Sequence, residues 1–127
     1  MIEMIAKKYR LTENEFKKVL SRRKPFFAHG MVANVLPNRL GYARIGILLG
    51  GKQAPGSVNR NYFRRSAYDL SRASLGKVGL DIVFTMKKGK PLDHKDPLMY
   101  EALKKDIEFL WKIVIRENPI NTKNPPV

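Results

Sequence analysis

Residues 58–72 constrain the fold more than any other stretch, because a helix built from them has two unlike faces. At about 100° per residue, one face collects side chains suited to packing. They are Tyr62, Phe63, Ala67, Leu70 and, just beyond the stretch, Ala73. The opposite face collects Arg60, Asn61, Arg64, Arg65, Tyr68 and Arg72. Such a helix packs on one side and exposes its charges on the other, where they contact either water or a polyanion. A charged face that only contacts water is the simpler alternative to a binding surface.

The charge of the whole chain favours a polyanion. Its 127 residues include 25 Lys and Arg against 11 Asp and Glu, which gives a formal net charge of +14. On a small domain such a charge indicates nucleic acid first and an anionic membrane surface second. Arg and Asn are also side chains that hydrogen-bond phosphates and base edges. A hydrophobic content of 43% supports a real core, so the chain is not a disordered basic tail.

Cysteine usage and apolar runs indicate the compartment. The sequence has no cysteine, which excludes disulfides, thiolate zinc sites and cysteine nucleophiles and fits a reducing compartment. No apolar run reaches the length of a membrane span, and the N-terminus lacks the apolar core of a signal peptide. We therefore expect a cytoplasmic protein without a membrane partner.

Two further helices are predicted from their start signals. One begins at Thr12, an N-cap whose capping box is closed by Glu15, and is ended by Pro25. The other follows Asp96, an N-cap placed directly before a proline at the first helical position. Its apolar stripe includes Trp111, which is expected to lie in the core.

Strands are predicted where the apolar pattern loses its helical period. They cover residues 31–36, 42–49 and 80–86, and a short strand near 26–29 precedes them. A glycine-rich loop, residues 50–57, leads to the basic helix, which Ser57 or Asn59 is expected to cap. We predict an α+β sandwich of element order α-β-β-β-α-β-α, in which helices pack a four-stranded sheet. One domain spans residues 1–117, and a proline-rich tail follows over residues 118–127.

No constellation of residues indicates a catalytic or metal site in the chain. His29 and His94 stand far apart, and neither has a partner at metal-ligand spacing. The Gly50-Gly51-Lys52 stretch lacks the spacing of a phosphate-binding P-loop. A protein-only nuclease would need a cluster of carboxylates or histidines, and the sequence offers none. Any part in catalysis is expected to be positioning.

Arg60-Asn61, followed by Phe63-Arg64-Arg65, resembles the signature of the protein subunit of bacterial ribonuclease P. The resemblance extends from about Leu11 to Val114 in the same element order. It includes the helix start at 13–16, the strand end at 35–36 and the Asp-Ile-Val strand at 81–83.

The resemblance implies an RNA-binding subunit of a ribonucleoprotein endoribonuclease. It would bind a catalytic RNA that removes the 5′ leader from precursor tRNA, with the catalytic groups in the RNA. Mg²⁺ is expected with the RNA, and no cofactor is expected on the protein alone. The family's fold implies an unusual left-handed β-α-β crossover around the signature helix. Outside the ribonucleoprotein we expect a monomer.

The family's contacts are carried over to matching positions in this sequence. Those expected to face the catalytic RNA and the tRNA are Lys52, Arg60, Asn61, Arg64 and Arg65. Those expected to line the cleft that receives the leader are Phe16, Leu20, Val32, Asn34, Arg64 and Tyr68. For Phe16, packing in the core and stacking on a leader base both remain open.

The sequence departs from the family at several of these positions. Tyr62 stands where the signature has its third arginine, and Gly51 stands where the loop has a lysine. Leu20 and Asn34 occupy places where the family often has aromatic residues, and Tyr68 replaces an arginine. The alternative function is a general RNA-binding module, of ribosomal or RNA-chaperone type, that ignores the leader.

Overall fold

A computed structural model describes residues 5–22, 24–89 and 91–118. Its elements follow in the order η1 (Lys7–Tyr9), α1 (Glu13–Arg22), β1 (Lys24–Phe27), β2 (Met31–Pro37), β3 (Arg44–Leu48), α2 (Ser57–Ser71), η2 (Arg72–Lys77), β4 (Leu80–Met86) and α3 (Pro97–Glu117). The predicted α+β fold and its order of helices and strands are confirmed. All of the predicted tail except Asn118 lies outside the described residues, so the domain boundary stays a prediction.

The four strands form one sheet in the order β1-β2-β4-β3. β2 pairs antiparallel with both β1 and β4, whereas β3 and β4 are parallel neighbours. Parallel neighbours need a crossover connection, and α2 provides it. The left-handed sense expected for this crossover stays a prediction.

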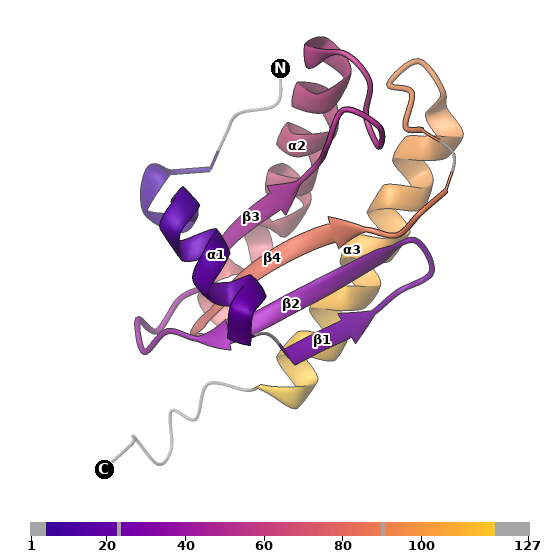
Figure 1. The fold of residues 1–127 in the computed structure, drawn as a ribbon. Helices are drawn as coiled ribbons and strands as arrows, with labels where there is room; N and C mark the ends of the chain where they lie inside the picture. The colour runs from indigo at the N-terminus through magenta and orange to yellow at the C-terminus, as the bar shows by residue number, and fades with distance from the viewer. Residues whose placement is uncertain (1–4, 23, 90, 119–127) are drawn as a thin grey trace.

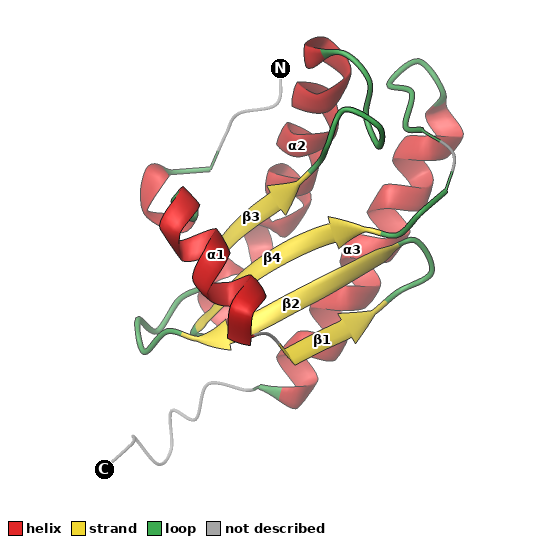
Figure 2. Cartoon of the chain, viewed as in Figure 1, coloured by secondary structure: helices red, strands yellow, loops and turns green. Residues whose placement is uncertain are grey.

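Helices cover both faces of the sheet (Figure 2). α2 and α3 lie on one face, and α1 lies across the other (Figure 1). Because successive strand residues point to opposite faces, β4 contributes to two clusters. Ile82 and Phe84 belong to the main core with α2 and α3, whereas Val83 belongs to a smaller cluster with Val19 of α1. Trp111 lies in the main core as predicted, and its indole N–H donates to Ser71 Oγ (2.9 Å).

The predicted start of α1 is confirmed. The backbone N–H of Thr12 donates to Glu15 Oε1 (2.7 Å), and the N–H of Glu15 donates to Thr12 Oγ1 (3.4 Å). α1 ends at Arg22, and Pro25 lies inside β1. Proline is tolerated there because β1 is an edge strand.

The predicted cap of α2 is wrong. The N-cap is Gly56 at φ 86°, and no side chain of the described residues caps the helix. Asn59 lies within the helix and is buried. The face of α2 that packs against the rest of the protein is also wider than predicted, because α2 contacts both β3 and α3. Tyr68, expected on the exposed face, is therefore only 5% exposed.

In the described part of the chain, no helix has both the length and the apolar character that a bilayer crossing requires.

Candidate functional site

The exposed side of α2 carries three guanidinium groups that no carboxylate neutralises within the described residues. Arg64 Nη1 donates to Asn61 Oδ1 (3.2 Å), and Arg60 Nη1 donates to the carbonyl of Ala54 (3.4 Å). Arg65 and Asn61 are exposed. We call Arg60, Asn61, Arg64 and Arg65 the α2 basic face. Its unpaired cations suit a polyanion, because Arg presents a planar fork of donors to phosphate.

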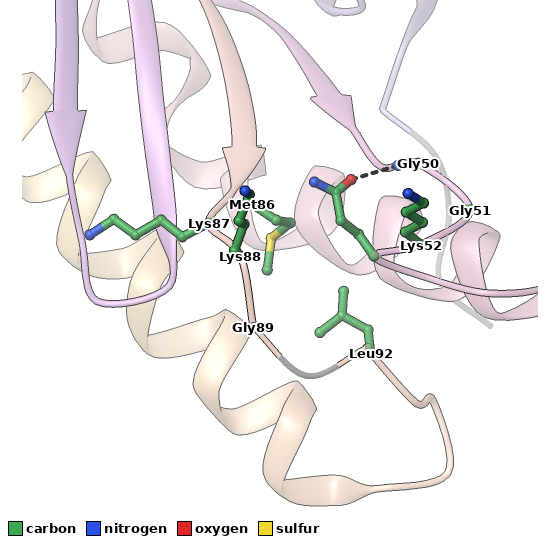
Figure 3. Close-up of a pocket in the computed structure, with 9 residues that line it drawn as sticks. Gly50, Gly51, Lys52, Met86, Lys87, Lys88, Gly89 and Leu92 are labelled. Carbon is green, nitrogen blue, oxygen red and sulfur yellow. Dashed lines mark hydrogen bonds between the residues drawn. The ribbon is translucent and has the colours of Figure 1, made fainter.

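A pocket of about 440 Å³ lies beside the start of α2 (Figure 3). It is lined by Gly50, Gly51, Lys52, Gln53, Met86, Lys87, Lys88, Gly89 and Leu92. The Gln53 side chain accepts from the N–H of Gly50 (2.7 Å), and its carbonyl accepts from the N–H of Leu92 (2.7 Å). The first bond closes the Gly50–Gln53 loop, and the second ties this loop to the segment that contains Leu92. Lys52, predicted to face RNA, is exposed at this pocket.

Lys87 and Lys88 are candidate contacts that the sequence reasoning missed. They follow β4 directly, in a lysine-rich turn whose composition was the available signal. The turn lies near the Gly50–Gln53 loop only because β3 and β4 are neighbours in the sheet.

Asn59 fixes the segment beyond that turn to α2. Its Nδ2 donates to the carbonyl of Leu92 (2.6 Å), and its Oδ1 accepts from the backbone N–H of His94 (2.7 Å). The ring of Tyr62 lies 5.9 Å from that of His94 and 6.4 Å from that of Tyr100. The departure at Tyr62 therefore adds packing between α2 and α3.

A groove of about 430 Å³ opens between α1 and β3. We call it the α1–β3 groove; it is lined by Glu13, Phe16, Lys17, Leu20, Ile47, Leu48, Leu49 and Arg64. The ring of Phe16 lies directly on Gly46, where any Cβ would overlap it. Phe16 is only half-buried, so it packs on the sheet and also borders open space.

The structure places the other predicted leader contacts at different depths. Leu20 lies in the α1–β3 groove with Phe16 and Arg64. Val32 is half-buried on β2. Asn34 is 1% exposed; its Nδ2 donates to the carbonyl of Val83 (3.0 Å), while its Oδ1 has no hydrogen-bond partner among the described residues.

Tyr68 does not lie in the groove. Burial raises the pKa of its phenol, and the positive charges of Arg64 and Arg10 only partly offset this. The phenol is therefore neutral at pH 7. Its placement on the exposed face was wrong, and contact of Tyr68 or Asn34 with a leader stays a prediction.

An ion-pair network holds the start of α1 on the sheet. The Arg44 guanidinium donates twice to Asp81, from Nε to Oδ1 (2.8 Å) and from Nη2 to Oδ2 (2.7 Å), and also pairs with Glu15. Burial alone would raise the pKa of Glu15, but hydrogen bonds from Thr12 and the charge of Arg44 lower it. The bond to Asp81 raises the pKa of Arg44 despite desolvation. This network fixes the wall of the α1–β3 groove that α1 provides.

Across residues 5–22, 24–89 and 91–118, no three His, Cys, Asp or Glu side chains come close enough to hold a metal ion. The arrangement offers cations, hydrogen-bond donors and apolar surface. It is suited to binding an anionic polymer.

Comparison with known proteins gives consistent results. The family model described as Ribonuclease P matches residues 5–114. A curated relative, the "Ribonuclease P protein component" of Idiomarina loihiensis, is 31% identical over 105 residues, which covers 80% of this chain and 79% of the relative.

Solved structures show the same fold at lower identity. The RNase P protein of Staphylococcus aureus matches with a TM-score of 0.67 at 17% identity, covering 84% of this chain and 94% of that one. The RNase P protein of Thermotoga maritima matches with a TM-score of 0.56 at 19% identity, covering 91% and 94%.

Proposed function

The chain belongs to the ribonuclease P protein family, and we propose that it helps a catalytic RNA remove the 5′ leader from precursor tRNA. The position of Arg64 carries this proposal. Arg64 belongs to the α2 basic face and also lines the α1–β3 groove. One side chain thus joins a surface suited to structured RNA with a groove suited to a single strand.

The α2 basic face and Lys52 are the proposed contacts with the catalytic RNA and the body of the tRNA. Their cations lack carboxylate partners in the described residues, so phosphates would neutralise them without breaking ion pairs. Release of counterions from RNA then supplies much of the binding free energy.

The α1–β3 groove is the proposed path of the leader. Single-stranded RNA binds where bases stack on aromatic rings beside cations. Phe16 offers a ring, and Lys17 and Arg64 offer the cations. Leu20 and Val32 extend the apolar surface.

The chain's proposed part in the reaction is binding and positioning. The catalytic groups and Mg²⁺ are assigned to the RNA, as the family resemblance implies. The protein would raise cleavage at low Mg²⁺ because its cations replace part of the screening that the metal ions supply.

The test is cleavage of a precursor tRNA at low Mg²⁺ by the protein alone, by a bacterial ribonuclease P RNA alone, and by both. We expect cleavage at the mature 5′ end only with both. Binding without rescue, repeated with several such RNAs, would indicate the general RNA-binding module instead. Cleavage by the protein alone would place an active site in the chain.

A further inference from the structure

One row of side chains crosses all four strands on the face of the sheet that α1 partly covers. In the register of the sheet, Phe27 is opposite Val32, Val32 is opposite Thr85, and Thr85 is opposite Leu48. Residues paired in this way point to the same face. Leu48 also lines the α1–β3 groove, so the row continues the groove across the sheet.

α1 leaves this row open. It crosses the part of the face where β3 and β4 begin, and the row lies where they end (Figure 1). Phe27 is 59% exposed, Leu48 is 46% exposed, and Val32 and Thr85 are half-buried. An exposed aromatic on a four-stranded sheet is a known type of platform for unpaired RNA bases.

The turn that directly follows Phe27 is fixed by hydrogen bonds, although Phe27 lies at the end of an edge strand. Lys87 Nζ donates to the carbonyl of Ala28 (2.5 Å), and the N–H of Lys87 donates to the carbonyl of Gly30 (3.0 Å). The N–H of Gly30 in turn donates to Asp106 Oδ2 of α3 (3.0 Å). The turn after Phe27 is therefore tied to Lys87, directly after β4, and to α3.

A cation accompanies the exposed ring. Lys87 Nζ lies 5.6 Å from the centroid of Phe27. In Figure 3 the side chain of Lys87 extends away from Lys88 and toward the β1–β2 turn. The row thus has Lys17 and Arg64 near one end and Lys87 at the other. Cations at both ends of a largely apolar row match a single-stranded polyanion whose bases stack on the row and whose phosphates pair with the cations.

We propose that the leader path runs from the α1–β3 groove along this row, and that Phe27 is a second base-stacking platform beside Lys87. This inference rests on the proposed function. The row spans three strand spacings, roughly 14 Å, so it takes more than one nucleotide. Leu20 and Asn34 offer no ring on this face, and Phe27 supplies one from β1.

The geometry also gives the path a direction. Arg64 belongs to the surface proposed for the tRNA body, so the groove takes the leader nucleotides nearest the cleavage site. Phe27 then meets nucleotides farther upstream. A short leader ends before it reaches Phe27, and a long leader does not.

The test compares Phe27→Ala with the unchanged protein in complex with the catalytic RNA, using precursor tRNAs with leaders of about two and about ten nucleotides. We expect Phe27→Ala to weaken binding of the long leader roughly fivefold or more and to leave the short leader unchanged. Phe109→Ala is the matched control, since Phe109 is 50% exposed on α3, on the opposite side of the sheet. It should change neither affinity.

Phe27→Trp keeps the proposal testable if the alanine variant folds poorly. It should retain affinity for the long leader, and the long leader should quench its emission, while buried Trp111 is unaffected. Equal weakening for both leaders, no weakening, or no quenching would overturn the inference. A change in oligomeric state with Phe27→Ala would overturn it too and assign the face to a protein partner. Failure of the unchanged protein to support cleavage would instead count against the proposed function.

Discussion

The ring of Phe16 rests on the backbone of Gly46, at a point where any Cβ would overlap it. Helix α1 and strand β3 approach closely there because one side supplies a ring and the other supplies no side chain. The glycine thus determines how deeply Phe16 sits and how wide the α1–β3 groove is.

Gly46→Ala should destabilise the protein by about 1–3 kcal/mol, because the added methyl overpacks the contact with Phe16. The measurement is denaturant unfolding. Gly76→Ala is the control, since a Cβ there meets nothing within 4 Å. The double variant Gly46→Ala, Phe16→Ala should lose less than the sum of the two single variants. Additive losses would show that the two residues do not interact.

Phe16→Ala should weaken binding of a leader-bearing precursor more than binding of mature tRNA. The expected difference is about 1–3 kcal/mol, the value of one stacked base. Affinities for both RNAs, measured beside a melting curve, check it. Equal losses for the two RNAs, or a collapsed melting temperature, would assign Phe16 to packing alone.

Arg60→Ala and Arg64→Ala should each weaken RNA binding and reduce the slope of log K against log salt by about one unit. The reason is that each removes one phosphate contact and the counterion it releases. Arg116→Ala is the control, because Arg116 lies in the last turn of α3, at the end of the molecule away from the start of α2. An unchanged slope in both variants would remove the α2 basic face from the interface.

Stability should fall in acid through Glu15. Its pKa is lowered below 4.5 in the folded protein, so its contribution is complete above that pH and is lost as pH falls through the lowered value. Glu15→Gln should therefore lower stability at neutral pH and flatten the loss below pH 4.5. Unfolding curves across this range test it. Glu13→Gln is the control on the same helix, because the Glu13 side chain is exposed and pairs only with exposed Lys17 among the described residues; it should cost less stability at neutral pH than Glu15→Gln.

Local signals made much of the fold predictable. Thr12 and Glu15 form their capping box within four residues, and the side chain of Asp96 accepts from the N–H of Leu98 as its place before a proline predicts. The alternation in 80–86 separates Val83 from Ile82 and Phe84. Such features depend on neighbours in sequence, which a single chain displays.

Other features depend on partners far along the chain. Asn59 resembled a helix cap because its partners Leu92 and His94 are more than thirty residues away. Tyr68 looked exposed because a single helical stripe does not show that α2 has two neighbours. Phe27 joined no predicted site because its row with Leu48 exists only in the register of the sheet.

The strand order has a consequence for synthesis of the chain. β4 is the last strand in sequence, yet it lies between β2 and β3. As the chain leaves the ribosome, β1 and β2 can pair early, but the edge of β3 that faces β4 has no partner strand until residues 80–86 arrive. Two strand edges thus stay open in the nascent protein, a state prone to wrong pairing. A chain cut before residue 80 lacks β4, so its β1–β2 hairpin and β3 cannot join into one sheet.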